Sequence, residues 1–121
     1  MTREFLQETR SLLTPGGAVV ANTFSISQLY HHESTTYAAV FGPFYNLKNG
    51  ESANRVILAA NGPLPDTTIL KQRAADLAPS LRKYGIRLRD HLKELETRPD
   101  WDTSARVLTD QYAPANLLRD R

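Results

Sequence analysis

The fold of this chain is decided by residues 12–24, Leu12-Leu13-Thr14-Pro15-Gly16-Gly17-Ala18-Val19-Val20-Ala21-Asn22-Thr23-Phe24. Pro15 cannot continue a helix, and the two glycines that follow can adopt the positive φ angles of a tight turn from a helix into a strand. The uninterrupted apolar run at 18–21 predicts a strand covered on both faces of an α/β sheet. The polar pair at 22–23 is expected where this strand ends, and ligands of open α/β sheets bind at the carboxyl ends of strands.

Composition limits the class of protein. The 121 residues suffice for one domain with a hydrophobic core, and contents of 40% hydrophobic and 23% charged residues are typical of a soluble globular protein. No run approaches the ~20 apolar residues that cross a bilayer, and the N-terminal residues lack the apolar segment of a signal peptide. We therefore expect a cytoplasmic protein that does not bind membranes.

Several kinds of chemistry are not expected. The chain has no cysteine, and its net charge of +2 comes from basic residues interleaved with acidic ones, without an aromatic-lined basic stripe that would indicate nucleic-acid binding. His31 and His32 are adjacent, so on a helix they point about 100° apart, and no ligand at i+4 completes a metal site. No Ser-His-Asp arrangement and no phosphate-binding glycine motif is present.

Around the central strand, the sequence predicts a first helix capped by Thr2 and a second from about Ile26 to Val40, capped by Ser25 and ended by Gly42-Pro43. A hairpin follows, in which strands at 44–47 and 54–60 flank an Asn-Gly turn at 49–50. The apolar face expected for the first helix consists of Phe5, Leu6, Thr9, Leu12 and Leu13.

The second half of the chain is predicted to be helical. Asp66 is expected to cap a helix that Pro79 breaks or kinks, and Gly85 suits the position after a helix. The apolar positions of this helix are Leu70, Ala74, Leu77 and Leu81; those of a further helix, which ends before Pro99, are Leu88, Leu92 and Leu95. Residues 108–114 predict a turn leading into a short final helix.

Two or three strands make a poor α/β domain by themselves, because an isolated hairpin is marginal in water and a buried strand needs neighbours. The sequence therefore predicts part of a larger sheet. Asn22, at the expected end of the central strand, can hydrogen-bond an amine or hydroxyl of a ligand. Alternatively, it can cap the next helix or donate a hydrogen bond to a loop carbonyl. Tyr30, Tyr37 and Tyr45 can line a pocket for an aliphatic amine or pack in the core.

Residues 5–22 resemble a late helix and strand of class I S-adenosylmethionine-dependent methyltransferase folds, and most closely those of spermidine synthase-like proteins, the polyamine aminopropyltransferases. Residues 44–47 and 54–59 are similar to the last β-hairpin of that family, and residues 108–114 to its bacterial terminal motif, with Gln111 where Asp is usual. The resemblance implies an α/β fold in which residues 1–63 form the C-terminal half of a Rossmann-like domain and residues 64–121 a helical C-terminal extension.

The resemblance also implies a function, namely transfer of an aminopropyl group from decarboxylated S-adenosylmethionine to an amine such as putrescine. Asn22 stands where the family commonly has a Gln that contacts the amine, and Tyr45 lies near the family's tyrosine-bearing substrate loop, so both are candidate substrate-binding residues. The nucleoside-binding loop and the catalytic aspartate of the family have no counterpart here. We therefore expect no catalytic residue, no cofactor held within this chain, and no activity of the chain alone.

Three hypotheses remain open from the sequence. The chain is half of an aminopropyltransferase that needs an N-terminal half to bind a polyamine; or a non-enzymatic module that pairs through exposed strand edges; or a remnant of a methyltransferase. In the first two cases we expect a homo-oligomer or a partner chain.

Overall fold

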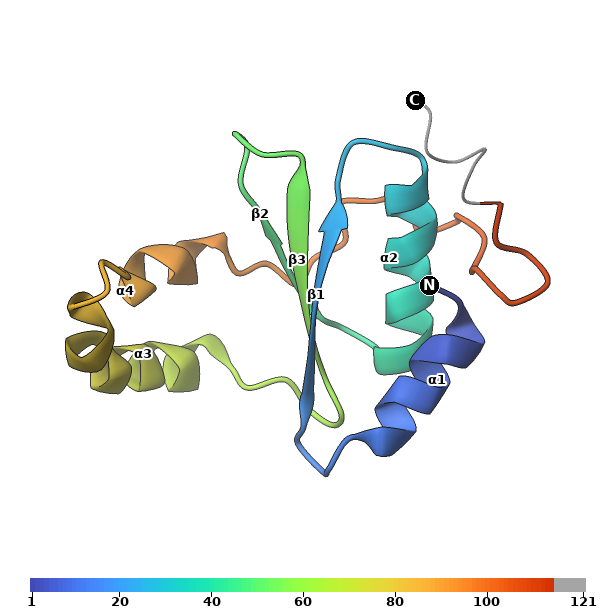
Figure 1. The fold of residues 1–121 in the computed structure, drawn as a ribbon. Coiled ribbons are helices and arrows are strands. Elements are labelled where there is room, and N and C mark those ends of the chain that lie inside the picture. Colours follow the sequence, from blue (N-terminus) through green and yellow to red (C-terminus); the bar gives the residue numbers. More distant parts are fainter. Residues whose placement is uncertain (115–121) are drawn as a thin grey trace.

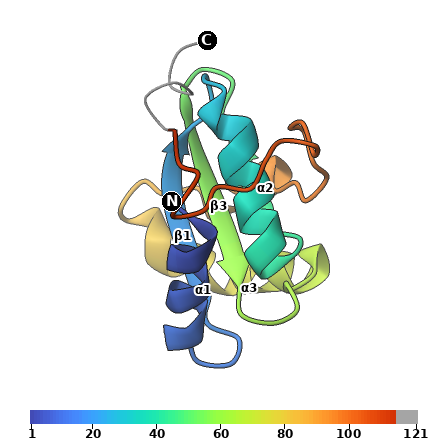
Figure 2. The same ribbon diagram turned by 90° about the vertical axis from the view of Figure 1, so that its right-hand side faces the viewer.

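A three-stranded antiparallel sheet separates two groups of helices in the computed structural model, which describes residues 1–114 (Figure 1). The strands are β1 (Ala18–Phe24), β2 (Tyr45–Lys48) and β3 (Asn54–Ala60), and β3 lies between the other two. Helices α1 (Arg3–Leu12) and α2 (Leu29–Phe41) cover one face, which Figure 2 shows from the helix side. The final short helix expected after Pro114 lies outside the described residues.

The hydrophobic core lies between the sheet and the two N-terminal helices. Phe44 and Ile57 of the hairpin pack there in one cluster with Leu6, and Trp101 from the C-terminal segment packs against it; Leu108, further along, is also buried. The backbone carbonyl of Leu108 accepts from Arg3 at 2.7 Å, and its amide donates to the Thr36 hydroxyl at 2.9 Å. The chain therefore returns across α1 and α2 and closes this face.

The turn between α1 and β1 forms as its glycines predict. Gly16 adopts a φ of +75°, while Gly17 is required for space, because a Cβ there would lie 2.9 Å from the carbonyl oxygen of Thr14. The Gly16 amide donates to the carbonyl of Asn61 at 2.9 Å, and the Asn61 amide donates to the carbonyl of Gly17 at 2.8 Å. These bonds fasten the turn to the end of β3.

The prediction for the central strand was wrong in two respects. The strand does not end at the polar pair Asn22-Thr23 but continues to Phe24, because β3 pairs with all seven of its residues. It is not covered on both faces either: Ala21 is buried beneath the helices, whereas Val20 and Phe24 are 68% and 65% exposed. Antiparallel pairing at the edge of the sheet gives the alternating burial of a half-covered strand.

The first two helices also differ in detail from the prediction. The Thr2 hydroxyl caps α1 by accepting from the Phe5 amide, as expected, but Phe5 and Leu12 are exposed, and only a narrow stripe around Leu6 is buried against α2. Ser25 does not cap α2. Its hydroxyl donates to the carbonyl of Ala53 at 3.0 Å, and the helix begins at Leu29 without a side-chain cap. Tertiary contacts therefore override the sequence signals for the apolar face of α1 and for the Ser25 cap of α2.

The hairpin is confirmed, since β2 and β3 pair in antiparallel register across the turn that contains Asn49, whose side chain accepts from the Glu51 amide. Asp66 caps α3 (Thr67–Arg82) by accepting from the Ile69 amide at 2.9 Å, and this helix continues through Pro79 without a break.

The further helix is shorter than predicted. It consists of α4 (Leu88–His91) and the 3₁₀ turn η1 (Leu92–Glu94), after Gly85 with a φ of +73°. Figure 1 shows α3 and α4 on the side of the sheet opposite α1 and α2. No helix among residues 1–114 combines the length and apolarity needed to span a membrane.

Candidate functional site

A hollow of about 530 Å³ lies at the carboxyl end of β1, and we call it the β1-end hollow. Asn22 is exposed on β1 and lines the hollow, whereas Glu33 reaches it from α2 with a side chain that is only 12% exposed. Within residues 1–114, the lining consists of Met1, Asn22, Thr23, Phe24, Ile26, Ser27, Leu29, Glu33 and Asn54. The hollow thus combines apolar walls with a carboxylate, two amides and hydroxyls.

Behind the hollow, Arg55 is buried completely and holds Glu33 in place. Its Nη2 atom lies 3.5 Å from a carboxylate oxygen of Glu33, its Nε donates to the Thr23 hydroxyl at 2.8 Å, and its Nη1 donates to the Ser34 hydroxyl at 2.6 Å. The guanidinium also lies 4.2 Å from the centroid of the Tyr30 ring. The guanidinium of Arg55 therefore links β3 to the end of β1, at Thr23, and to α2.

Burial dominates the protonation of this pair. It raises the pKa of Glu33, an effect that the charge of Arg55 offsets only in part, and it lowers the pKa of Arg55, which nearby Tyr30 and Glu33 counteract. Nearby, burial raises the pKa of Tyr37 to about 12, with the charge of Glu33 adding to the shift. Tyr37 is accordingly a neutral core side chain and no acid–base group.

A second polar cluster continues the network away from the hollow. The Tyr30 hydroxyl donates to Asp100, Asn46 donates to the same carboxylate at 3.2 Å, and the Lys48 ammonium lies 2.6 Å from its other oxygen. Partial burial raises the pKa of Asp100, but the hydrogen bonds from Lys48 and Tyr30 outweigh this effect and leave it below the ordinary value. Asp100 is therefore an ionised anchor for the segment that follows η1.

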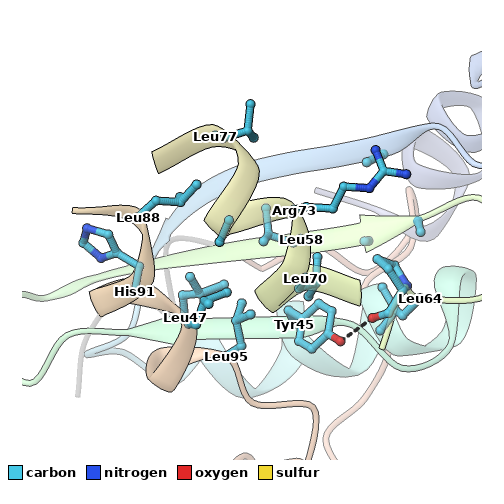
Figure 3. A pocket seen from close by; sticks show the side chains of 16 residues that line it. Tyr45, Leu47, Leu58, Leu64, Leu70, Arg73, Leu77, Leu88, His91 and Leu95 are labelled. Atoms are coloured by element: carbon cyan, nitrogen blue, oxygen red, sulfur yellow. Dashed lines mark hydrogen bonds between the residues drawn. The ribbon is translucent and has the colours of Figure 1, made fainter. Parts of the chain in front are cut away.

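The structure does not bring the two predicted substrate-binding residues together. Tyr45 is buried in a different cavity, of about 370 Å³, between the sheet and the helices α3 and α4 (Figure 3). Its hydroxyl donates to the carbonyl of Pro65 at 2.5 Å. Asn22 and Tyr45 thus lie in separate cavities, and Glu33, not Tyr45, shares the hollow with Asn22.

Sequence reasoning missed Arg55 and Glu33. A signal was present, because Arg55 alternates with Ile57 and Ala59 along a strand whose inward positions are otherwise apolar, and a cation at such a position needs a buried partner. The adjacent histidines contact the C-terminal segment: His31 Nδ1 accepts from the Asp102 amide at 3.0 Å, and His32 contacts the carbonyl of Arg106. Within residues 1–114 no three His, Cys, Asp or Glu side chains are grouped to hold a metal ion.

No protein-family model and no solved structure matches the chain. A polyamine aminopropyltransferase of Vibrio vulnificus (strain CMCP6) is 52% identical over 120 residues, which is 98% of this chain and 40% of that relative. The chain therefore spans well under half the length of the curated relative it matches. The resemblance inferred from the sequence is confirmed: along nearly its whole length, this chain is related to the C-terminal part of a polyamine aminopropyltransferase.

Proposed function

We propose that this chain is the C-terminal part of a polyamine aminopropyltransferase and that it takes part in moving an aminopropyl group from decarboxylated S-adenosylmethionine to an amine such as putrescine. The observation that carries this proposal is the 52% identity over 98% of the chain. The composition of the β1-end hollow agrees with it, because a carboxylate and amide oxygens beside apolar walls suit an aliphatic amine.

The proposed architecture is the C-terminal half of a Rossmann-like domain, residues 1–63, followed by a helical extension, residues 64–121. Its support is the outer edge of β1, which has no partner strand among residues 1–114. The seven residues of β1 include no charge and no proline, the usual protections of an exposed edge. Such an edge is suited to receive another strand of a longer sheet.

The reaction sets requirements that this chain meets only in part. The amine nitrogen attacks the methylene carbon next to the sulfonium; a C–N bond forms, the C–S bond breaks with its electron pair going to sulfur, and the amine loses a proton. We propose Asn22 and Tyr45 as substrate-binding residues. Because the Tyr45 hydroxyl donates to Pro65, it can only accept from a substrate. Decarboxylated S-adenosylmethionine is a co-substrate that the preceding half must bind.

The test is reconstitution. The purified chain, incubated with decarboxylated S-adenosylmethionine and putrescine, should give no spermidine, whereas co-expression with the remaining, N-terminal part of the Vibrio vulnificus relative should give a complex that does. Turnover by the chain alone would contradict the inactivity. Failure of the two parts to associate, together with a well-folded homodimer of the chain, would favour a non-enzymatic module that pairs through its strand edges.

A further inference from the structure

We infer that Glu33 is an anchor for an ammonium group in the β1-end hollow, so that the amine binds with one nitrogen against this carboxylate and its methylene chain along the apolar wall. The inference rests on the proposed function for the identity of the amine. It adds a residue that neither the sequence pattern nor the likeness to the relative assigns.

The hollow has the composition that a protonated alkylamine requires. Glu33 provides a carboxylate, the hydroxyls of Thr23 and Ser27 line the same hollow, and an ammonium with three N–H donors needs several acceptors at once. Phe24 and Leu29 provide apolar surface for methylene groups. Among residues 1–114, no Lys or Arg lines the hollow. A cation with an aliphatic chain is therefore the ligand that this lining fits, and a phosphate or a carboxylate is not.

Glu33 retains the capacity to bind a further donor. A carboxylate offers about four acceptor positions, and among residues 1–114 only Arg55 contacts this one, through a single nitrogen at 3.5 Å. The same guanidinium divides its other donors between Thr23 and Ser34. Asp100, the other acid of the network, differs in this respect, because Lys48, Tyr30 and Asn46 already occupy it. Glu33 is thus the acid with unused acceptor capacity.

The test variant must remove the carboxylate without leaving a buried charge. Glu33→Gln alone strands the guanidinium of Arg55, whereas the double variant Glu33→Gln/Arg55→Met removes both charges of the pair. Glu33→Asp is the conservative second variant, since it keeps the charge but withdraws it by one methylene. Glu8→Gln, at an exposed site on α1, removes an equal charge away from the hollow and is the matched control.

Putrescine binding to the purified chain is measured by titration calorimetry and by amide chemical shifts, with 1,4-butanediol as the uncharged analogue of the same length. We expect putrescine to bind about tenfold or more tightly than the diol, with shifts at residues 22–33. The double variant should lose about tenfold in affinity and Glu33→Asp several-fold, while Glu8→Gln should match the unchanged chain.

The inference is overturned if putrescine and the diol bind alike, if the shifts lie elsewhere, or if a folded double variant binds putrescine as tightly as the parent. If the double variant does not fold, Glu33→Asp decides. Reconstitution separates this result from the fate of the proposed function. A reconstituted enzyme whose KM for putrescine is unchanged by Glu33→Asp contradicts the anchor alone, whereas amine binding without any turnover contradicts the aminopropyl transfer alone.

Discussion

The two faces of the sheet differ in how completely they are packed. Beneath α1 and α2, the inward side chains of β3 are completely buried, and the aromatic ring of Tyr37 packs against those of Phe41 and Phe44. On the opposite face, α3 and α4 leave a cavity of about 370 Å³ walled by leucines, and the outward residues of β1 are exposed (Figure 3). The first face is a finished core and the second is partly covered.

This difference follows from where polar groups are placed. The finished face includes a buried cation, Arg55, which is tolerated because hydroxyls, a ring and a carboxylate surround it. The cavity on the partly covered face is lined mainly by apolar side chains, with Tyr45, Arg73 and His91 among them, so its packing depends mainly on apolar contact. Substitutions on the first face should therefore cost more and tolerate less change of shape.

The largest effect is expected at the pair of Glu33 and Arg55. Glu33→Gln leaves a guanidinium with no exposure unpaired, and it should lower the free energy of unfolding by about 3–5 kcal/mol. Arg55→Met should cost less, because the burial-raised pKa of Glu33 lets it become neutral. The double variant should recover much of the loss. Urea denaturation of all four proteins gives the coupling energy, and simple additivity would show that the pair does not stabilise this face as a unit.

Truncating two neighbouring residues of β3 allows the packing of the two faces to be compared directly. Ile57 is completely buried beneath the helices, whereas Leu58 points into the cavity on the other side and is only partly buried. Ile57→Ala should therefore destabilise by about 3 kcal/mol and Leu58→Ala by about 1–2 kcal/mol. Thermal unfolding of the two variants measures the difference. Equal losses would mean that the cavity is as well packed as the core.

Much of the first face could be predicted from local chemistry. The Thr2 cap, the Asn49 turn and the bounds of β3 depend on neighbours within a few residues, so the sequence pattern sufficed, as it did for the Asp66 cap of α3 on the other face. The partner of Ser25 could not be predicted, because Ala53 lies 28 positions away and competes for the hydroxyl.

The same limit applies to the site. Asn22 could be proposed as a site residue because it follows an apolar run, whereas the role proposed for Glu33 depends on Arg55, which only the pairing of β1 with β3 brings beside α2. The exposure of β1 is likewise a property of what covers the sheet and not of its own residues. A pattern of apolar letters indicates a strand, but it does not show how many of its faces are covered.

Enlarging a small side chain should have opposite signs on the two faces. Ala74 of α3 is buried and borders the cavity, so Ala74→Met can place its flexible side chain in empty space and should stabilise by about 1 kcal/mol. Ala21 of β1 lies in the packed core, so Ala21→Leu should destabilise by about 2 kcal/mol. Denaturation midpoints of the pair measure both effects, and the same sign for both would refute the contrast in packing.

The smallest effect concerns Asp100, which ties the segment after η1 to Lys48 at the margin of the finished face. Its pKa lies below the ordinary carboxyl value when folded, so its stabilisation is present above the unfolded pKa and is lost as the pH falls through the folded one. Because the side chain is 42% exposed, solvent screens the pair, and Asp100→Asn should cost less than about 1 kcal/mol at neutral pH. The gap between the two unfolding free energies should close as the pH is lowered from about 5 to about 2. A gap that stays constant over this range would show that the charge of Asp100 contributes nothing, and that its hydrogen bonds with Tyr30 and Asn46 alone hold the segment.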